Sequence, residues 1–241
     1  MMINSQVHLS KFIELESNKL IERPGYFSVD TNLTKSIIMK GIKFKYFNSD
    51  EYIFDNLDLE IERNKHTIIT GPNGSGKSTL LGLISKVFYP EKGEIKLNTD
   101  DIGYVGVTPL IIDGSLKDNL LYGNSSPKTD DEIMSLIKEF ELFNNDERGL
   151  NTLIDRKSLS SGQMQKISFI RSLLGETKLL LLDESTSNLD IETKQLIFNI
   201  LKNKDITIVN STHNKEDFEY DYHIKINYVG DKRKIINFDE F

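Results

Sequence analysis

Residues 71–78 read Gly71-Pro72-Asn73-Gly74-Ser75-Gly76-Lys77-Ser78, and this stretch decides the fold. It fits the pattern G-x-x-x-x-G-K-[ST], in which glycines let the backbone curl so that successive N–H groups point at phosphate oxygens. A β-branched run, His66–Thr70, leads into it, and a helix is expected to start within the turn. The positive end of that helix dipole would face the phosphates as well. The sequence therefore predicts a strand, a phosphate-binding loop and a helix in direct succession.

The side chains of this loop have separate expected tasks. Lys77 is expected to reach the β- and γ-phosphates of a nucleotide, and Ser78 to offer its hydroxyl to Mg²⁺. A glycine-rich turn that binds no phosphate is the alternative, and the position between a strand and a helix disfavours it. The residues expected to contact the nucleotide are Gly71, Asn73, Gly74, Ser75, Gly76, Lys77, Ser78 and Thr79.

An apolar strand that ends in two carboxylates is the second candidate element of the site. Leu179–Leu182 is followed by Asp183 and Glu184. Asp183 is expected to hold the Mg²⁺ shell, and Glu184 to orient and polarise the attacking water as a general base. Alone the pattern is weak, because many buried strands end in an acidic turn. Downstream of a phosphate loop it indicates hydrolysis of a nucleoside triphosphate.

Composition places the chain among globular proteins. Its 241 residues suit one large α/β domain, and 38% of them are hydrophobic against 28% charged. A net charge of −7 argues against a nucleic-acid partner, which needs clustered Lys and Arg. Because there is no cysteine, disulfides and thiolate metal sites are excluded. No apolar run approaches the roughly 20 residues that cross a bilayer and no signal peptide is evident, so any membrane-spanning part is expected elsewhere.

The first part of the chain is expected to lie outside the compact domain. Ser5–Asn18 can form a helix, and the polar stretch through Pro24 and Gly25 is typical of a linker. We therefore expect a helix and linker over residues 1–36 and one domain over residues 37–241.

Within that domain the hydrophobic pattern changes twice. Strand patterns come first, and a capping box at Thr129 and Glu132 then predicts an all-helical subdomain inserted over about 115–160. Continuous apolar strands such as Leu179–Leu182 follow, as in a parallel sheet covered on both faces. The last strands are expected to form a hairpin that turns at Gly230-Asp231.

The pentapeptide Leu159-Ser160-Ser161-Gly162-Gln163 indicates a family. Here the sequence resembles the ATP-binding cassette superfamily, whose signature is typically L-S-G-G-Q followed by a helix, with Ser161 in place of the first glycine. A serine hydroxyl and N–H groups at a helix N-terminus can form a second anion cradle, although a serine-capped helix start is the simpler alternative. In that family the cradle completes the site of the opposing protomer. The resemblance implies that Ser160, Gly162 and Gln163 bind the ATP of a second cassette.

The other motifs of this family follow in order along the chain. Ser187-Asn188-Leu189-Asp190 resembles the D-loop, and the resemblance assigns Asp190 to the nucleotide site. His213 matches the switch histidine, which contacts the γ-phosphate and the catalytic carboxylate. Tyr46 matches the aromatic residue that stacks on adenine, a π-face contact. Phe47 is a competing candidate for that contact, and a core or edge-strand tyrosine is the other reading.

The resemblance covers about residues 37–241 and implies both fold and activity. The expected fold is α/β: a P-loop NTPase core with a mixed or parallel sheet, an antiparallel β-subdomain and an all-helical subdomain. The expected reaction is hydrolysis of ATP to ADP and phosphate with Mg²⁺. Its expected catalytic residues are Glu184, His213 and Lys77, and its metal ligands Ser78 and Asp183.

One position departs from the family pattern. The family normally has a glutamine in the loop that joins the core to the helical insertion, and alignment on Thr108-Pro109 and Asp113-Gly114-Ser115 places Val107 there. Valine can neither coordinate Mg²⁺ nor bind water through hydrogen bonds. The usual metal contact is therefore expected to be missing.

Three functions share the expected fold. The first is the ATPase of a membrane transporter, the second a soluble cassette ATPase, and the third a degenerate cassette that clamps ATP with little hydrolysis. Lys77 and Ser160 lie too close in sequence for the long coiled coil of DNA-repair cassettes, and Thr108–Gly123 resembles the exporter branch. We therefore expect a cassette on the cytoplasmic side of a membrane that dimerises with a second cassette, identical or not, and works with a transmembrane domain.

Overall fold

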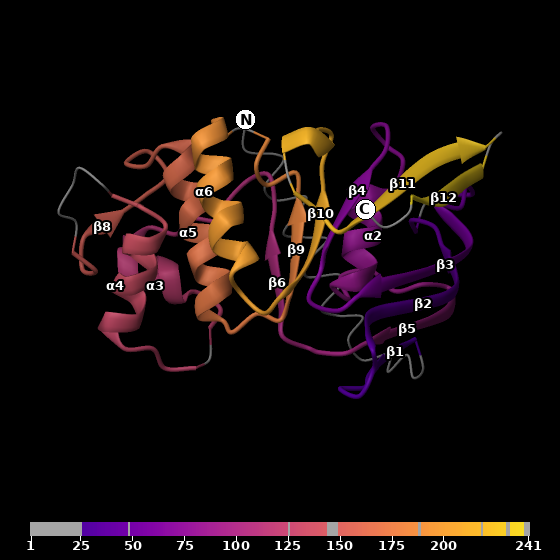
Figure 1. Ribbon diagram of the computed structural model, residues 1–241, viewed down its shortest axis with the longest axis horizontal. Coiled ribbons are helices and arrows are strands. Elements are labelled where there is room, and N and C mark those ends of the chain that lie inside the picture. Colours follow the sequence, from indigo (N-terminus) through magenta and orange to yellow (C-terminus); the bar gives the residue numbers. More distant parts are fainter. Residues whose placement is uncertain are drawn as a thin grey trace.

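The computed structural model is organised around a six-stranded sheet in the order β12-β11-β4-β10-β9-β6 (Figure 1). Five of its strands are parallel and only the edge strand β12 runs antiparallel to its neighbour. In sequence order the strands are β4 (His66–Thr70), β6 (Ile102–Val105), β9 (Leu179–Asp183), β10 (Thr207–Ser211), β11 (Tyr222–Val229) and β12 (Lys232–Phe238).

The structure describes residues 26–238 with gaps at 48, 125, 144–148, 188, 218 and 230–231, and it does not describe the side chains of 217 and of 228 onward. The expected helix at Ser5–Asn18 and the hairpin turn at Gly230-Asp231 lie outside the described residues, although β11 and β12 do pair as an antiparallel hairpin.

A second, four-stranded sheet lies at one end of the molecule, in the order β1-β5-β2-β3. Its strands β5, β2 and β3 are antiparallel, as expected, and β1 pairs parallel with β5. Because β1 lies ahead of residue 37, this sheet begins earlier than the sequence pattern indicated; the strand is too short and too exposed to show a periodicity. The bounds are β1 (Phe27–Val29), β2 (Lys35–Phe44), β3 (Phe54–Glu62) and β5 (Lys92–Leu97).

The helical part lies at the opposite end of the molecule, beyond helices α5 and α6 (Figure 1). It also contains a short two-stranded sheet of β7 and β8, whereas the sequence predicted only helices in this region. Strands of two residues are too short to show a hydrophobic periodicity. The bounds are β7 (Gly114–Ser115), α3 (Leu116–Leu121), α4 (Asp130–Glu139), β8 (Leu153–Ile154), α5 (Ser161–Leu174), α6 (Ile191–Lys202) and the short helix η2 (Lys215–Asp217).

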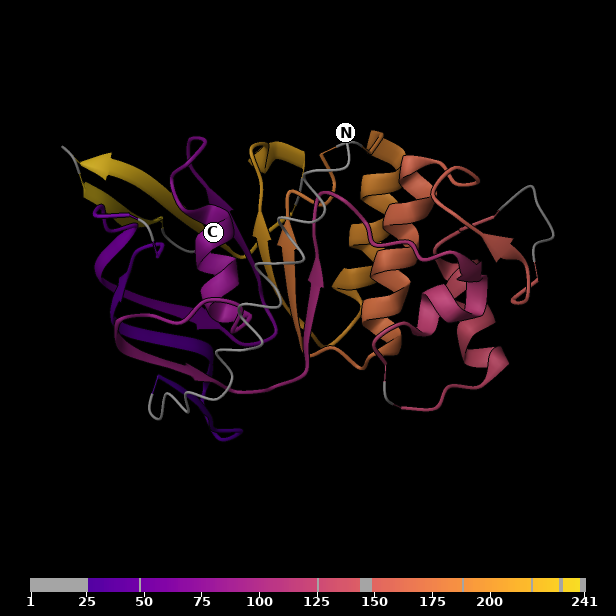
Figure 2. The ribbon, with the colours of Figure 1, turned by 180° about the vertical axis from the view of Figure 1, so that it is seen from behind.

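Strand β9 has a separate core on each of its faces. Leu180 and Leu182 pack into the cluster formed with α5 and α6. Leu179 and Leu181 pack into the cluster formed with α2 (Lys77–Ile84) and the four-stranded sheet. Successive side chains of a strand point to opposite faces, so four consecutive leucines serve both cores. Figure 2 shows α5 and α6 on one side of this sheet and α2 on the other.

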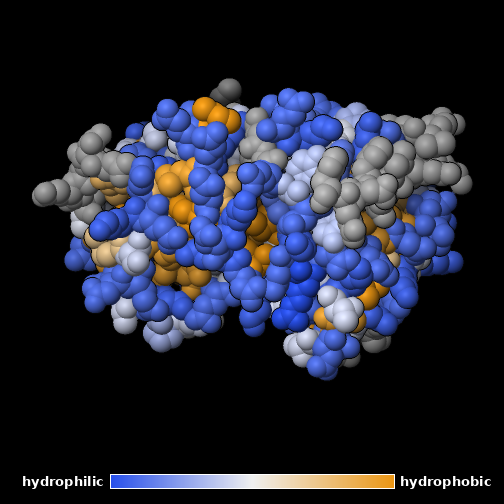
Figure 3. Space-filling view, in the orientation of Figure 1, coloured by the Kyte–Doolittle hydropathy of each residue, from blue (hydrophilic) through white to orange (hydrophobic). Residues whose placement is uncertain are grey.

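The face of the molecule seen in Figure 3 is mainly hydrophilic, and hydrophobic residues are visible between the helices at the helical end. Within the described residues, no helix combines the length and the apolar character needed to cross a bilayer.

Leu180 should contribute strongly to stability, because its side chain is fully buried between β9 and the helices. We expect Leu180→Ala to lower the free energy of unfolding by about 2–5 kcal/mol, measured by urea denaturation. The matched control is Leu153→Ala, whose side chain is 79% exposed, and it should change stability by no more than about 0.5 kcal/mol. Equal effects of the two substitutions would contradict the two-core arrangement.

Candidate functional site

The loop between β4 and α2 can only be built with glycine at two positions. Gly71 has φ +156°, and a Cβ there would lie 2.6 Å from the carbonyl oxygen of Ile226. Gly76 has φ +104°, in the left-handed region, and a Cβ there would lie 3.0 Å from Ile53 Cγ2. Close packing on both sides therefore fixes the path of the loop, and any side chain at either position would displace it.

The first turn of α2 opens toward this loop without a side-chain cap. Gly76 is the N-cap residue and has no side chain to satisfy the first N–H groups of the helix. Lys77 Nζ donates to the carbonyl oxygens of Gly71 (3.1 Å) and Pro72 (3.4 Å), which holds its largely buried ammonium group beside the loop. Uncapped N–H groups and a fixed cation make this a site for phosphate oxygens. Of the remaining loop candidates, Asn73 and Gly74 are exposed, whereas Ser75 and Thr79 are buried.

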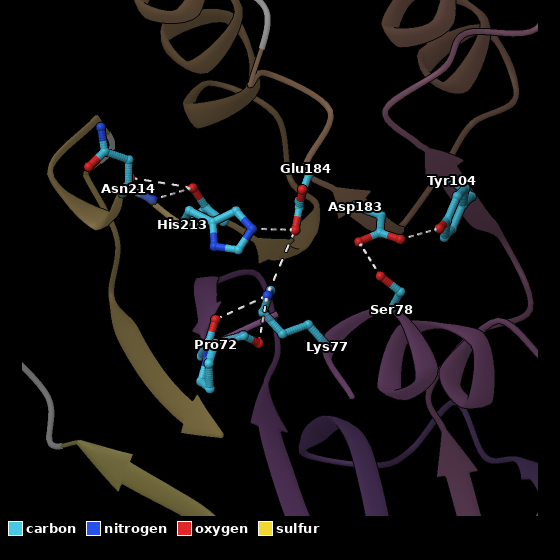
Figure 4. A network of polar contacts seen from close by, with 10 residues as sticks. Pro72, Lys77, Ser78, Tyr104, Asp183, Glu184, His213 and Asn214 are labelled. Atoms are coloured by element: carbon cyan, nitrogen blue, oxygen red, sulfur yellow. Dashed lines mark hydrogen bonds and ion pairs between the residues drawn. The ribbon is translucent and has the colours of Figure 1, made fainter. Parts of the chain in front are cut away.

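The carboxylate of Asp183 joins three elements at the end of β9 (Figure 4). Ser78 Oγ, on α2, donates to Asp183 Oδ1 at 3.0 Å. Tyr104 Oη, on β6, donates to Oδ2 at 2.9 Å. Burial and the neighbouring Asp183 charge raise the pKa of Tyr104, so its hydroxyl stays protonated as a donor. The structure thus brings the expected ligands Ser78 and Asp183 together and adds a partner, Tyr104, that no sequence motif marks.

Glu184 turns away from Asp183 toward a second group of residues. Its backbone has φ +49°, a left-handed conformation that is uncommon for a residue with a side chain. Its Oε1 lies 2.8 Å from His213 Nε2 and 3.8 Å from Lys77 Nζ. The expected catalytic residues Glu184, His213 and Lys77 therefore converge at one place.

Tyr46 contacts the first turn of α2, next to the phosphate loop. Its hydroxyl is 2.7 Å from Thr79 Oγ1, and its ring meets Phe44 and Phe88 edge to face, with centroids 5.3 Å and 5.5 Å apart. The ring remains 42% exposed, so it can still stack on a flat ligand. Phe47 is 99% exposed and has no such support, which favours Tyr46 of the two candidates.

The signature segment lies away from the phosphate loop of the same chain. Ser160 caps α5: its Oγ accepts from Gln163 N, and Gln163 Oε1 accepts from Ser160 N. Gly162 is loosely surrounded, since a Cβ there would meet Leu189 Cδ2 only at 3.8 Å, an ordinary van der Waals distance. Helices α5 and α2 pack on opposite faces of β9, and no hydrogen bond or ion pair joins Ser160 to the loop among the described residues. The structure therefore does not bring Ser160, Gly162 and Gln163 to the site around Lys77.

Asp190 has a local role at the start of α6. Its Oδ1 accepts from Thr193 N at 2.8 Å and its Oδ2 from Thr193 Oγ1 at 3.0 Å, a helix N-cap. These hydrogen bonds from Thr193 lower the pKa of the Asp190 carboxyl. No described contact links it to the phosphate loop, and the neighbouring Asn188 lies outside the described residues.

Val107 follows β6 with its side chain 43% exposed. A buried glutamine of α5 lies beneath its backbone: Gln165 Nε2 donates to the carbonyl oxygens of Gly106 (3.3 Å) and Val107 (3.1 Å). No sequence motif predicted this contact. It holds the backbone of the loop, but the side chain at position 107 remains apolar.

The comparisons with known proteins agree with this geometry. The family model described as "ABC transporter" matches residues 54–187. An ATP-dependent permease of Candida albicans is 34% identical over 204 residues, which cover 75% of this chain and 30% of that protein. A putative export ATP-binding/permease protein of Rickettsia prowazekii is 33% identical over 214 residues, which cover 80% of this chain and 37% of that protein.

A solved structure of a bacterial Atm1-family ABC exporter with ATP bound has a similar fold. The TM-score is 0.72 at 21% sequence identity, and the match covers 93% of this chain and 43% of that one. The chain therefore spans well under half the length of the relatives named here.

The family match covers more than half of the chain, and the phosphate loop, the paired carboxylates and His213 are assembled in one place. The chain therefore belongs to the ABC transporter family, as a nucleotide-binding ATPase domain similar in sequence to those of export permeases.

Proposed function

We propose that this domain binds ATP with Mg²⁺, dimerises around it with a second cassette and hydrolyses it to drive export through a transmembrane partner. The observation that carries the proposal is the convergence of Lys77, Asp183, Glu184 and His213 on the loop at the start of α2 (Figure 4). On this account the domain occupies the chain from β1 onward.

Each residue of the site would have a separate role in binding or hydrolysing ATP. The loop N–H groups and Lys77 would hold the β- and γ-phosphates, and Tyr46 would stack on the adenine. Glu184 would take a proton from the attacking water as the γ-phosphate bond breaks. His213 holds one oxygen of that carboxylate, and the described residues offer Oε2 no hydrogen-bond partner, which leaves it able to accept the proton.

Ser78 and Asp183 fit a divalent metal ion. Mg²⁺ prefers oxygen ligands and is commonly held by one or two protein groups together with substrate phosphates. A hydroxyl and a carboxylate already 3.0 Å apart at the loop provide such groups. When bound, the ion would neutralise phosphate charge that develops during the reaction.

The position of Ser160 supports a composite site between two chains. Its hydroxyl, Gly162 and the N-terminus of α5 form a polar surface that its own phosphate loop does not use. A second copy or a related cassette could present this surface to the γ-phosphate, so that ATP would join the two domains. Asp190 and Leu189 lie in the segment next to it.

Two exposed side chains that lie against Arg171, those of Leu110 and Tyr122, support docking to a membrane partner. Arg171 Nη2 donates to the carbonyl oxygen of Leu110 at 2.9 Å, and the guanidinium lies 5.7 Å from the ring centre of Tyr122. Leu110 and Tyr122 are 51% and 48% exposed, whereas the adjoining Pro109 and Ile111 are buried. The Leu110–Tyr122 patch would therefore receive the transmembrane partner on the cytoplasmic side of the membrane.

The names of the relatives favour transport over a soluble cassette ATPase. The intact Glu184–His213 pair favours hydrolysis over a degenerate clamp, in which these groups would not be needed.

We expect Glu184→Gln to bind ATP normally, to lower turnover by at least about 100-fold, and to form an ATP-dependent dimer, because the shape of the site survives while the base is lost. Light scattering after size-exclusion chromatography in Mg-ATP measures the dimer. A variant that binds ATP yet stays monomeric at saturation would contradict the composite site.

Adding Ser160→Arg to Glu184→Gln should remove this dimer and leave ATP binding per chain unchanged, because the arginine blocks only the surface offered to the other protomer. Thr129→Arg is the matched control, since it removes the same kind of capping box from α4 and should leave the dimer intact. Dimers that survive Ser160→Arg would show that the signature segment does not meet the partner.

The docking patch can be tested with a single cysteine, because the chain has none. In membranes that contain the complete transporter, Leu110→Cys should form thiol crosslinks to the transmembrane domain, detected as a shifted band on gels. Val29→Cys, which is 39% exposed on the four-stranded sheet, is the control and should not. Crosslinks from Val29→Cys alone would place the partner on the other end of the domain.

A further inference from the structure

Both oxygens of the Asp183 carboxylate are held by hydroxyl groups from different elements. Ser78 Oγ donates to Oδ1 from α2, and Tyr104 Oη donates to Oδ2 from β6 (Figure 4). Asp183 as a whole is only 9% exposed. Because rotating it would break both hydrogen bonds, the two hydroxyls fix the direction in which its remaining lone pairs point.

Tyr104 reaches Asp183 because β6 and β9 are parallel neighbours. Tyr104 stands opposite Leu181 in the register, two residues before Asp183, and its long side chain spans that offset. Of the residues Ile102–Val107, only Tyr104 has a polar side chain. Val107 offers a half-exposed isopropyl group, and its backbone carbonyl is held by Gln165. The β6 side of the Asp183 carboxylate therefore has one polar side chain available, and it is Tyr104.

We propose that Tyr104 is a positioning residue for the divalent metal ion: its hydroxyl orients Asp183 and provides the polar group that position 107 lacks. The proposal rests on the proposed function, since the ion would arrive with ATP. A hydroxyl that donates its proton to Asp183 keeps lone pairs that can accept from a water of the metal shell. Groups in this position orient the ligands and tune metal affinity by about 10–100-fold.

The experiment measures metal binding without catalysis. Mn²⁺ replaces Mg²⁺, a non-hydrolysable ATP analogue fills the site, and electron paramagnetic resonance counts free and bound Mn²⁺. Tyr104→Phe keeps the ring and removes only the hydroxyl. It should weaken Mn²⁺ binding by about 10-fold or more and leave the metal-free affinity for the analogue unchanged.

Two further variants make the result specific. Val107→Gln, added to Tyr104→Phe, supplies an amide on the same segment and should recover most of the lost Mn²⁺ affinity. A protein that had merely lost its fold would not be recovered in this way. Tyr26→Phe removes a tyrosine hydroxyl that donates to the carbonyl oxygen of Glu91 at 3.2 Å, and this variant should bind Mn²⁺ like the wild type.

Unchanged Mn²⁺ affinity in Tyr104→Phe would overturn the proposal. A loss that Val107→Gln does not recover would overturn it as well, because Tyr104 would then serve only to shape the strand end. If the wild-type protein binds the analogue equally well with and without Mn²⁺, metal binding as part of the proposed function is wrong. This outcome concerns the wild type, so it can be told apart from the two outcomes for Tyr104→Phe.

Discussion

The turn between Asp183 and Glu184 is the constraint on which the site depends. Asp183 is the last residue of β9, and its carboxylate faces Ser78 and Tyr104. Glu184 takes a left-handed backbone conformation, which costs about 1–2 kcal/mol for a residue with a side chain. Its N–H donates to the carbonyl oxygen of Ser211, so β10 holds the turn in place. The two adjacent carboxylates therefore face different neighbours: Asp183 faces Ser78 and Tyr104, and Glu184 faces His213.

The two cores on either side of β9 keep the phosphate loop and the signature segment of one chain apart. The core under α2 positions the phosphate loop, and the core under α5 positions Ser160 on the opposite side of the sheet. A rigid sheet between them keeps these surfaces apart. Under the proposed function a second cassette would complete the site, and ATP bound between two domains would link their association to hydrolysis.

Much of the site could be predicted because its chemistry is local in sequence. The glycines that shape the loop, Lys77 and Ser78 form one continuous stretch, and four leucines lead directly to Asp183 and Glu184. The bounds of β4 were predicted for the same reason, since the β-branched run His66–Thr70 is a local signal. His213 was identified by motif order, and the structure places it against Glu184.

What the sequence could not predict depends on contacts between distant segments. Tyr104 and Gln165 act through neighbours that only the sheet register and the packing of α5 bring close. The short strands β1, β7 and β8 carry no periodicity, so the early start of the sheet and the strands in the helical region were missed. The sequence analysis did not predict that Asp190 caps α6, because the family resemblance assigned this residue to the nucleotide site.

The most direct test of the central claim is the rate of phosphate release from ATP by the purified protein and its Lys77→Ala variant, in the presence of Mg²⁺. The account predicts slow but measurable turnover for the wild type and a rate at least about 100-fold lower for the variant, equivalent to about 2.7 kcal/mol of barrier, because the fixed cation beside the loop is lost. Equal rates for the two proteins, or no turnover by the wild type, would contradict it.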